Sequence, residues 1–114
     1  MITFNFEFTD KNEKNVIFKA EENGRFLGNC CLELTESFAV VSNVSYSESS
    51  PFIVEGLLKA AFNFAANRSY YIGRCTASGI DVFLKKMKFV KCDGYYENDI
   101  PTILMGCCGG GCNL

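Results

Sequence analysis

The feature that most limits the fold is a helix with very little polar surface. Residues 52–66 contain no interior proline, and they follow Ser50 and Pro51, which are typical of a helix cap and a first helical turn. The polar side chains recur every four residues and form one narrow stripe: Glu55, Lys59, Asn63 and Asn67. Because the rest of the circumference is apolar, one sheet cannot cover this helix. We therefore expect cover on more than one side, from other elements or from a second copy of the chain.

Four strand-like segments precede this helix. Residues 2–8 alternate between apolar and polar side chains, as a strand with one buried face does. Residues 16–22 and 25–34 flank Asn23-Gly24, a pair that suits the tight turn of a β-hairpin. Residues 38–45 form a further strand. The first half therefore predicts an antiparallel meander.

The segments after the helix alternate between strand and helix patterns. We expect a short buried strand, a second and shorter helix and a closing pair of strands joined at Asn98-Asp99; their ranges are 70–75, 79–88, 89–97 and 100–105. The resulting order is β-β-β-β-α-β-α-β-β, an α+β pattern. We expect one domain over residues 1–106 and an irregular Gly- and Cys-rich tail over residues 107–114.

Composition excludes several classes of protein. The chain has 114 residues, of which 48% are hydrophobic, so it can form one compact core. Eleven Lys and Arg residues against thirteen Asp and Glu residues give a net charge of −2, which argues against nucleic-acid or anionic-membrane binding. No apolar stretch approaches the ~20 residues of a membrane span, and residues 2–8 do not resemble a signal peptide. We expect a cytoplasmic protein.

The chain contains no histidine. This excludes nucleophiles activated by histidine and metal sites that combine Cys with His. Catalysis here would have to use carboxylates, tyrosines, thiols, lysines or backbone amides.

Three stretches carry a resemblance to a known family. They are residues 40–45 (Val-Val-Ser-Asn-Val-Ser), 56–61 (Gly-Leu-Leu-Lys-Ala-Ala) and 83–89 (Phe-Leu-Lys-Lys-Met-Lys-Phe). In this order they resemble the GNAT-type N-acetyltransferases, whose Lys-Leu-Gly-Phe pattern has Lys88 at its glycine position here. The resemblance implies a mixed, mostly antiparallel sheet with a long central helix and a second, shorter one.

The resemblance also implies an acyl donor, acetyl-CoA or another acyl-CoA, whose acyl group passes to an amine. The backbone of Asn43, Val44 and Ser45 would bind pantetheine where the strand parts from its neighbour. The family's diphosphate-binding motif falls on residues 49–54, which implies contacts from Ser49, Ser50, Phe52, Ile53 and Val54. The family's basic residue is absent, and Phe52 and Val54 stand at its glycine positions. The alternative is that Ser50 and Pro51 only cap the helix.

The catalytic residues stay open. The tyrosine that protonates the leaving thiolate in the family corresponds to Leu84, which has no proton to give. The candidates that could replace it are Tyr95, Tyr96, Tyr70 and Tyr71, and the candidate bases are Glu33 and Glu48. Half-buried strand tyrosines and solvated carboxylates are the alternative interpretation.

The chain departs from the family between its first two strands. There the family has two helices that shape the acceptor site, whereas this chain has only residues 9–15. That wall is therefore missing or supplied by another chain, and we expect a homodimer. A second function class stays open: a GNAT-fold binding or assembly module without catalysis, whose cysteine-rich tail binds metal or partner thiols.

Three of the seven cysteines lie close together near the C-terminus, at Cys107, Cys108 and Cys112, with three glycines between the last two. Flexible glycines allow thiolates to converge on zinc or iron. A tetrahedral site needs a fourth ligand, for which Cys75, Cys92 or a second chain are candidates. The alternatives are a reduced, disordered tail and a substrate or modification site.

Overall fold

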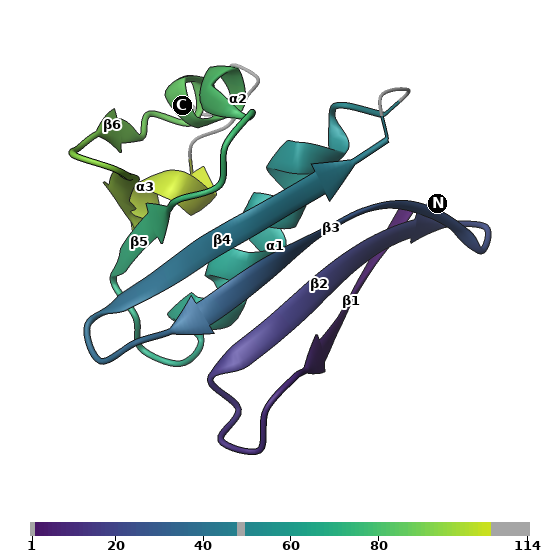
Figure 1. Ribbon diagram of the computed structural model, residues 1–114, viewed down its shortest axis with the longest axis horizontal. Coiled ribbons are helices and arrows are strands. Elements are labelled where there is room, and N and C mark those ends of the chain that lie inside the picture. Colours follow the sequence, from purple (N-terminus) through teal and green to yellow (C-terminus); the bar gives the residue numbers. More distant parts are fainter. Residues whose placement is uncertain (1, 48–49, 106–114) are drawn as a thin grey trace.

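The computed structural model describes residues 2–47 and 50–105. Within them, seven strands form one sheet in the order β1-β2-β3-β4-β5-β7-β6, accompanied by three helices (Figure 1). The strands are β1 (Ile2–Phe8), β2 (Asn15–Glu22), β3 (Arg25–Leu34), β4 (Phe38–Tyr46), β5 (Ile72–Cys75), β6 (Val90–Lys91) and β7 (Tyr96–Asp99). The helices are α1 (Ile53–Ala66), α2 (Asp81–Lys86) and α3 (Ile100–Met105).

The predicted meander is confirmed. Strands β1 to β4 pair antiparallel in sequence order, and β5 then lies parallel to β4 after the crossover through α1. At the β2–β3 turn both Asn23 and Gly24 have positive φ, 54° and 82°, which matches the expected hairpin. The α+β class and the mixed, mostly antiparallel sheet are therefore as expected.

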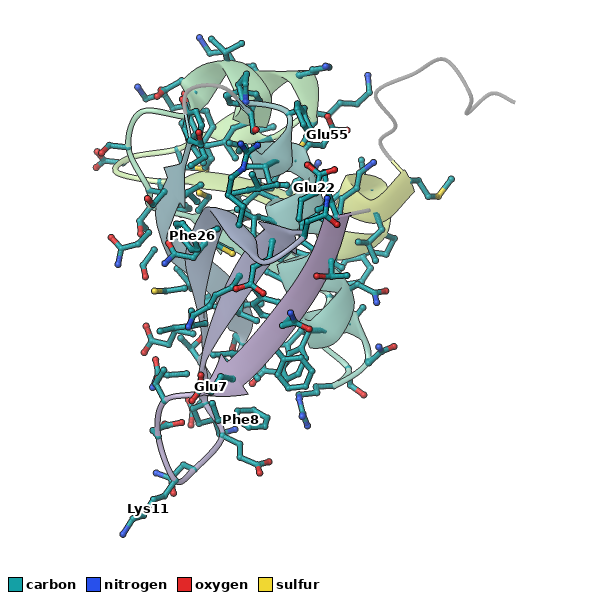
Figure 2. The ribbon with its side chains drawn as sticks, turned by 90° about the vertical axis from the view of Figure 1, so that its right-hand side faces the viewer. Glu7, Phe8, Lys11, Glu22, Phe26 and Glu55 are labelled. Atoms are coloured by element: carbon teal, nitrogen blue, oxygen red, sulfur yellow. The ribbon has the colours of Figure 1, made fainter. Side chains whose placement is uncertain are left out.

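Helix α1 is enclosed by the chain's own elements. It lies behind the sheet in Figure 1, and Figure 2 shows β1 and α3 on either side of it. The rings of Phe6 on β1 and Phe64 on α1 are 5.0 Å apart, and the Phe4 ring occupies the space beside Gly56. The cover that the sequence demands thus comes from β1, the central strands and α3. Self-association stays a prediction, and it now depends on the other face of the sheet.

That other face, which we call the front face, is turned toward the viewer in Figure 1. No described helix lies over it. The loop between β1 and β2 spans residues 9–14 and contains no helix. No helix among the described residues is long and apolar enough to cross a membrane.

The expected closing strand pair is wrong in its second half. Strand β7 ends at Asp99, and residues 100–105 form α3 instead of a strand, so the reversal lies at residues 92–95 between β6 and β7. The cause is a helix start: Asp99 Oδ2 accepts the Thr102 N–H at 2.8 Å, and Pro101 lies in the first turn. The second predicted helix, 79–88, is shorter than expected, Asp81–Lys86. The predicted tail at 107–114 lies outside the described residues.

Lys88 has the backbone conformation that the family's glycine pattern requires. Its φ is 71°, in the left-handed region that glycine adopts most easily. The Phe89 N–H donates to the Leu84 carbonyl at 2.9 Å, and the Lys88 N–H donates to the Lys85 carbonyl at 3.0 Å. Together these bonds end α2 in a Schellman motif with Lys88 as its left-handed residue.

Candidate functional site

Strands β4 and β5 part in the middle of the sheet. They pair from Phe38 and Ile72 to Val41 and Cys75, and the Thr76 N–H then donates to the Val41 carbonyl at 2.9 Å. Beyond that bond β4 continues to Tyr46 along β3 alone, and no described strand pairs with its other edge. We call the space beside this edge the slot, and Figure 1 shows the two strands diverging there.

A β-bulge lies at the point of divergence. On β3, Leu32 and Cys31 are neighbours, but their partners on β4 are Val41 and Asn43, so Ser42 is an extra residue. A bulge bends its strand and increases the local twist. Gly28 permits the course that β4 then takes, because a Cβ there would lie 2.6 Å from the Ser45 carbonyl oxygen.

The predicted pantetheine-binding residues follow this bulge. Asn43 and Ser45 are exposed, whereas the Val44 side chain packs against the core. At the outer end of the slot Tyr46 contacts Phe83 of α2 in a T-shaped arrangement, with ring centroids 6.1 Å apart. An aromatic contact therefore crosses the slot at its mouth.

The start of α1 is less open than the sequence suggested. The N–H groups of Ile53 and Val54 donate to the carbonyls of Ser50 and Pro51 at 3.0 and 3.2 Å. The helix follows Phe52, which has no side-chain cap and whose own side chain is 61% exposed. The two expected phosphate-facing amides thus already have backbone acceptors. Ser49 and Glu48 lie outside the described residues.

The candidate Tyr96 is held by α2. Its hydroxyl donates to Asp81 Oδ2 at 2.7 Å. This hydrogen bond is the main reason that the pKa of Tyr96 is raised and that the pKa of Asp81 is lowered. Both residues line a cavity of about 240 Å³ at the end of β5, together with Thr76 and Tyr95. A phenol that donates to a carboxylate in this way gives up its proton less readily, which makes Tyr96 a poorer acid.

Tyr95 and Glu33 lie on the front face. The Tyr95 ring stacks on the guanidinium of Arg74, with 4.3 Å between the ring centroid and Cζ. The strand register places Glu33 opposite Val40 and Val40 opposite Arg74, so these three form one row across the sheet. Of the candidates, these are the ones that the fold brings toward the inner end of the slot.

Of the remaining positions, Leu84 and Tyr70 serve the fold. Leu84 is fully buried, so the family's acid position is part of the core. The Tyr70 hydroxyl donates to the Thr35 carbonyl at 2.6 Å, next to the β3–β4 turn and away from the slot. Tyr71 is 61% exposed.

The metal prediction falls outside what the structure describes, because it depends on Cys107, Cys108 and Cys112. Among the described residues, no group of three or more metal-ligating side chains occurs. Cys30 is buried beside the Leu57 carbonyl, and burial raises the pKa of its thiol to about 12. Burial also raises the pKa of Cys75 to about 11, which disfavours the thiolate that a metal would need.

Two residues of the site, Ser42 and Arg74, are not among the residues predicted from the sequence. The bulge at Ser42 has only a weak sequence signal: the core-facing residues of this strand change from odd to even positions between Val41 and Val44, but Phe38 and Val40 are apolar as well. The stacking of Arg74 has none, because its partners are far away in the sequence.

The chain resembles known proteins in its three-dimensional structure but not in its sequence. No family model and no curated protein matches the chain in sequence. Solved structures do match it in three dimensions. A Desulfovibrio desulfuricans protein assigned to the GNAT family of acetyltransferases has a TM-score of 0.72 at 10% identity, over 88% of this chain and 99% of that one.

Two further structures agree. An N-acetyltransferase from Staphylococcus aureus Mu50 has a TM-score of 0.69 at 14% identity, covering 89% of this chain and 99% of its own. An E. coli protein assigned as an N-acetyltransferase, solved with bound coenzyme A, has a TM-score of 0.67 at 13% identity, covering 87% and 98%. At these identities the likeness is one of architecture. The chain has the fold of the GNAT-type N-acetyltransferases.

Proposed function

We propose that this chain binds an acyl-CoA in the slot between β4 and β5 and transfers its acyl group to an amine. The observation that carries the proposal is that no strand among the described residues pairs with this edge of β4 beyond Val41. Backbone groups in the middle of a sheet are normally paired, so an edge left open there is suited to a ligand that supplies the missing partners. The E. coli neighbour with bound coenzyme A supports the same donor class.

The slot fits the pantetheine arm better than the diphosphate. Amide groups of pantetheine can pair with the backbone of Asn43, Val44 and Ser45 as a further strand would. At the start of α1, in contrast, the N–H groups of Ile53 and Val54 are engaged and Pro51 has none. Because Ser50 is only 5% exposed, the polar contacts would have to come mainly from the hydroxyl of Ser49 and the backbone of Phe52. We therefore expect donor binding to depend mainly on the slot.

The chemistry would rest on positioning. When bound, the acyl-CoA supplies a thioester whose carbonyl carbon is attacked by the amine. Backbone N–H groups near the bulge can stabilise the oxygen of that carbonyl as it becomes negative. Glu33 is the candidate that accepts the ammonium proton through water. Because Leu84 replaces the family's tyrosine, the leaving thiolate would take its proton from solvent or from Tyr95.

A second candidate function is a binding or assembly module that keeps the fold without catalysis. Two observations favour it: the buried Leu84 at the acid position and the engaged amides at the start of α1. In this case the front face would join two copies of the chain. The tail cysteines Cys107, Cys108 and Cys112 would bind zinc, iron or partner thiols.

Thermal unfolding with and without acetyl-CoA tests the proposed donor. A ligand present at a hundred times its Kd adds about 2.7 kcal/mol to the unfolding free energy, so the Tm should rise by several degrees. Pantetheine alone should give part of this rise, and adenosine 3′,5′-bisphosphate, which lacks the arm, should give little. An unchanged Tm with acetyl-CoA would refute the proposal. Stabilisation without release of free thiol in the presence of amines would favour the second candidate.

A further inference from the structure

The front face carries an arginine whose position is fixed from three strands. Arg74 lies on β5, and its guanidinium carbon is 3.5 Å from the ring centroid of Phe38 on β4 and 4.3 Å from that of Tyr95. Its Nε donates to Glu97 Oε1 on β7 at 2.7 Å. We call these four residues the Arg74 clamp. The guanidinium is thus held before any ligand arrives.

The clamp leaves one part of the guanidinium available. The rings of Phe38 and Tyr95 lie against the guanidinium, and the hydrogen bond and ion pair to Glu97 both use Nε. Across residues 2–47 and 50–105, no hydrogen-bond partner is found for Nη1 or Nη2. The Arg74 side chain is 27% exposed, so solvent reaches it. A planar edge with parallel N–H groups binds a carboxylate through two hydrogen bonds.

The position of the clamp relates it to the slot. Arg74 is followed by Cys75, the last β5 residue that pairs with β4, and it lies opposite Val40. Val41 and Cys75 are fully buried on the α1 side, so a second substrate cannot approach the inner end of the slot from that side, whereas the front face is open to it. That face has no described helix over it.

We propose that Arg74 binds a carboxylate of the acceptor, so that the acceptor is an amine that also carries a carboxylate, as amino acids do. This inference rests on the proposed acyl transfer and names its acceptor class. The charge of the clamp favours a carboxylate over a phosphate, because Glu97 already balances the guanidinium and a dianion would be repelled. The two rings fix the guanidinium, so little conformational entropy is lost when the carboxylate binds.

A binding experiment tests the clamp without turnover. The side-chain Nε–H signal of Arg74 and the backbone signals of Cys75 and Thr76 are followed by NMR during titration with N-acetylglycine. We expect saturable shifts with N-acetylglycine and none with N-acetylglycinamide, which has the same shape without the charge. Inorganic phosphate should bind at least tenfold more weakly. Equal shifts with the amide, or tighter binding of phosphate, would overturn the proposal.

A transfer experiment compares matched acceptors that differ only in the carboxylate, tyrosine with tyramine and lysine with cadaverine. The natural chain should prefer the amino acid, and Arg74→Lys, which keeps the charge but loses the planar edge, should lower kcat/KM for it about tenfold while tyramine changes little. Lys91→Gln is the control. It removes a nearby positive charge, but the Lys91 ammonium lies on the other side of the sheet, 5.9 Å from the centroid of the Tyr96 ring, so this variant should still prefer the amino acid. If Arg74 has only a structural role, Arg74→Lys should lower kcat/KM for both acceptors equally. That result would refute the assignment.

The two proposals fail separately. If acetyl-CoA raises the Tm and N-acetylglycine does not bind, the acceptor assignment is wrong and the donor site stands. If N-acetylglycine binds at Arg74 and acetyl-CoA does not raise the Tm, the carboxylate site stands and acyl transfer is refuted.

Discussion

Val41 and Cys75 face each other as the last residue pair between the parallel strands β4 and β5. Both side chains are fully buried on the α1 side, where the core seals the point of divergence. The strands therefore part inside the sheet and open only toward the front face and toward α2. An opening at this place exposes backbone groups in a position where most sheets have none, which is why we assign the donor to it.

Gly28→Ala should destabilise the protein and weaken donor binding. A Cβ at this position would meet a backbone atom, the Ser45 carbonyl oxygen, at 2.6 Å, and backbone cannot move aside cheaply. We expect the unfolding free energy to fall by about 1–3 kcal/mol, as for other overpacked sites. Because the clash pushes β4 into the slot, the Tm rise with acetyl-CoA should also shrink.

Gly73→Ala provides the matched control. Its Cβ would meet the Phe62 ring at 2.6 Å on the α1 side of β5, away from the open edge of β4. Urea unfolding should show a comparable loss of stability, while the Tm rise with acetyl-CoA stays that of the natural chain. If both variants lose donor binding equally, the loss in Gly28→Ala does not come from a displacement of β4 into the slot.

Lys88→Gly should stabilise the protein. Lys88 has a φ of 71°, a conformation in which a side chain is strained and glycine is not. We expect the unfolding free energy to rise by about 0.5–1 kcal/mol, measured by urea titration. Lys86→Gly, two residues earlier and at the last residue of α2, should instead lower it by about 1 kcal/mol. A loss of stability in both variants would contradict the assignment of strain to Lys88.

Much of the fold follows from local patterns in the sequence. The alternation in residues 2–8, the Asn23-Gly24 turn and the single polar stripe of α1 each determine one element, and each appears in the structure. The strand expected over residues 100–105 is wrong. This segment is apolar and short, which fits a strand as well as a helix. Asp99 and Pro101 carry the opposite signal, that of a helix start, and Asp99 does cap α3.

The site is harder to predict because tertiary contacts build it. The alignment with the family placed the slot beside residues 43–45, and the divergence of β4 from β5 lies there. The Arg74 clamp joins residues of β4, β5 and β7 with Tyr95, which directly precedes β7, and only the strand register brings them together. Likewise, the engaged amides of Ile53 and Val54 depend on the turn before α1, which a cap pattern does not specify.

Phe83→Ala should lower stability and raise the affinity for acetyl-CoA. Phe83 contacts Tyr46 across the mouth of the slot, with ring centroids 6.1 Å apart, so the rings must separate when a donor enters. Loss of the aromatic pair and of the half-buried ring should reduce the unfolding free energy by about 1–2 kcal/mol. Binding no longer has to break this contact, so the Kd measured by calorimetry should fall.

Val82→Ala is the control for that variant. Val82 is the neighbouring residue on α2 and its side chain is 76% exposed, so neither stability nor donor affinity should change appreciably. A weaker affinity in Phe83→Ala would instead mean that the ring forms part of the binding surface.

Tyr96→Phe should change how stability depends on pH at both ends of the range. The Tyr96 hydroxyl lowers the pKa of Asp81 below 3.8, so that hydrogen bond stabilises the fold above about pH 4 and is lost as the pH falls through the lowered value. The pKa of Tyr96 is raised above 10.0, so its contribution is complete below about pH 10 and is lost at higher pH, where the unfolded chain ionises first. Urea midpoints measured from pH 2 to 11 should therefore fall less steeply at both ends in Tyr96→Phe than in the natural chain. Tyr71→Phe, at an exposed tyrosine, should leave the profile unchanged. Identical profiles for Tyr96→Phe and the natural chain would show that the Tyr96–Asp81 bond does not contribute to stability.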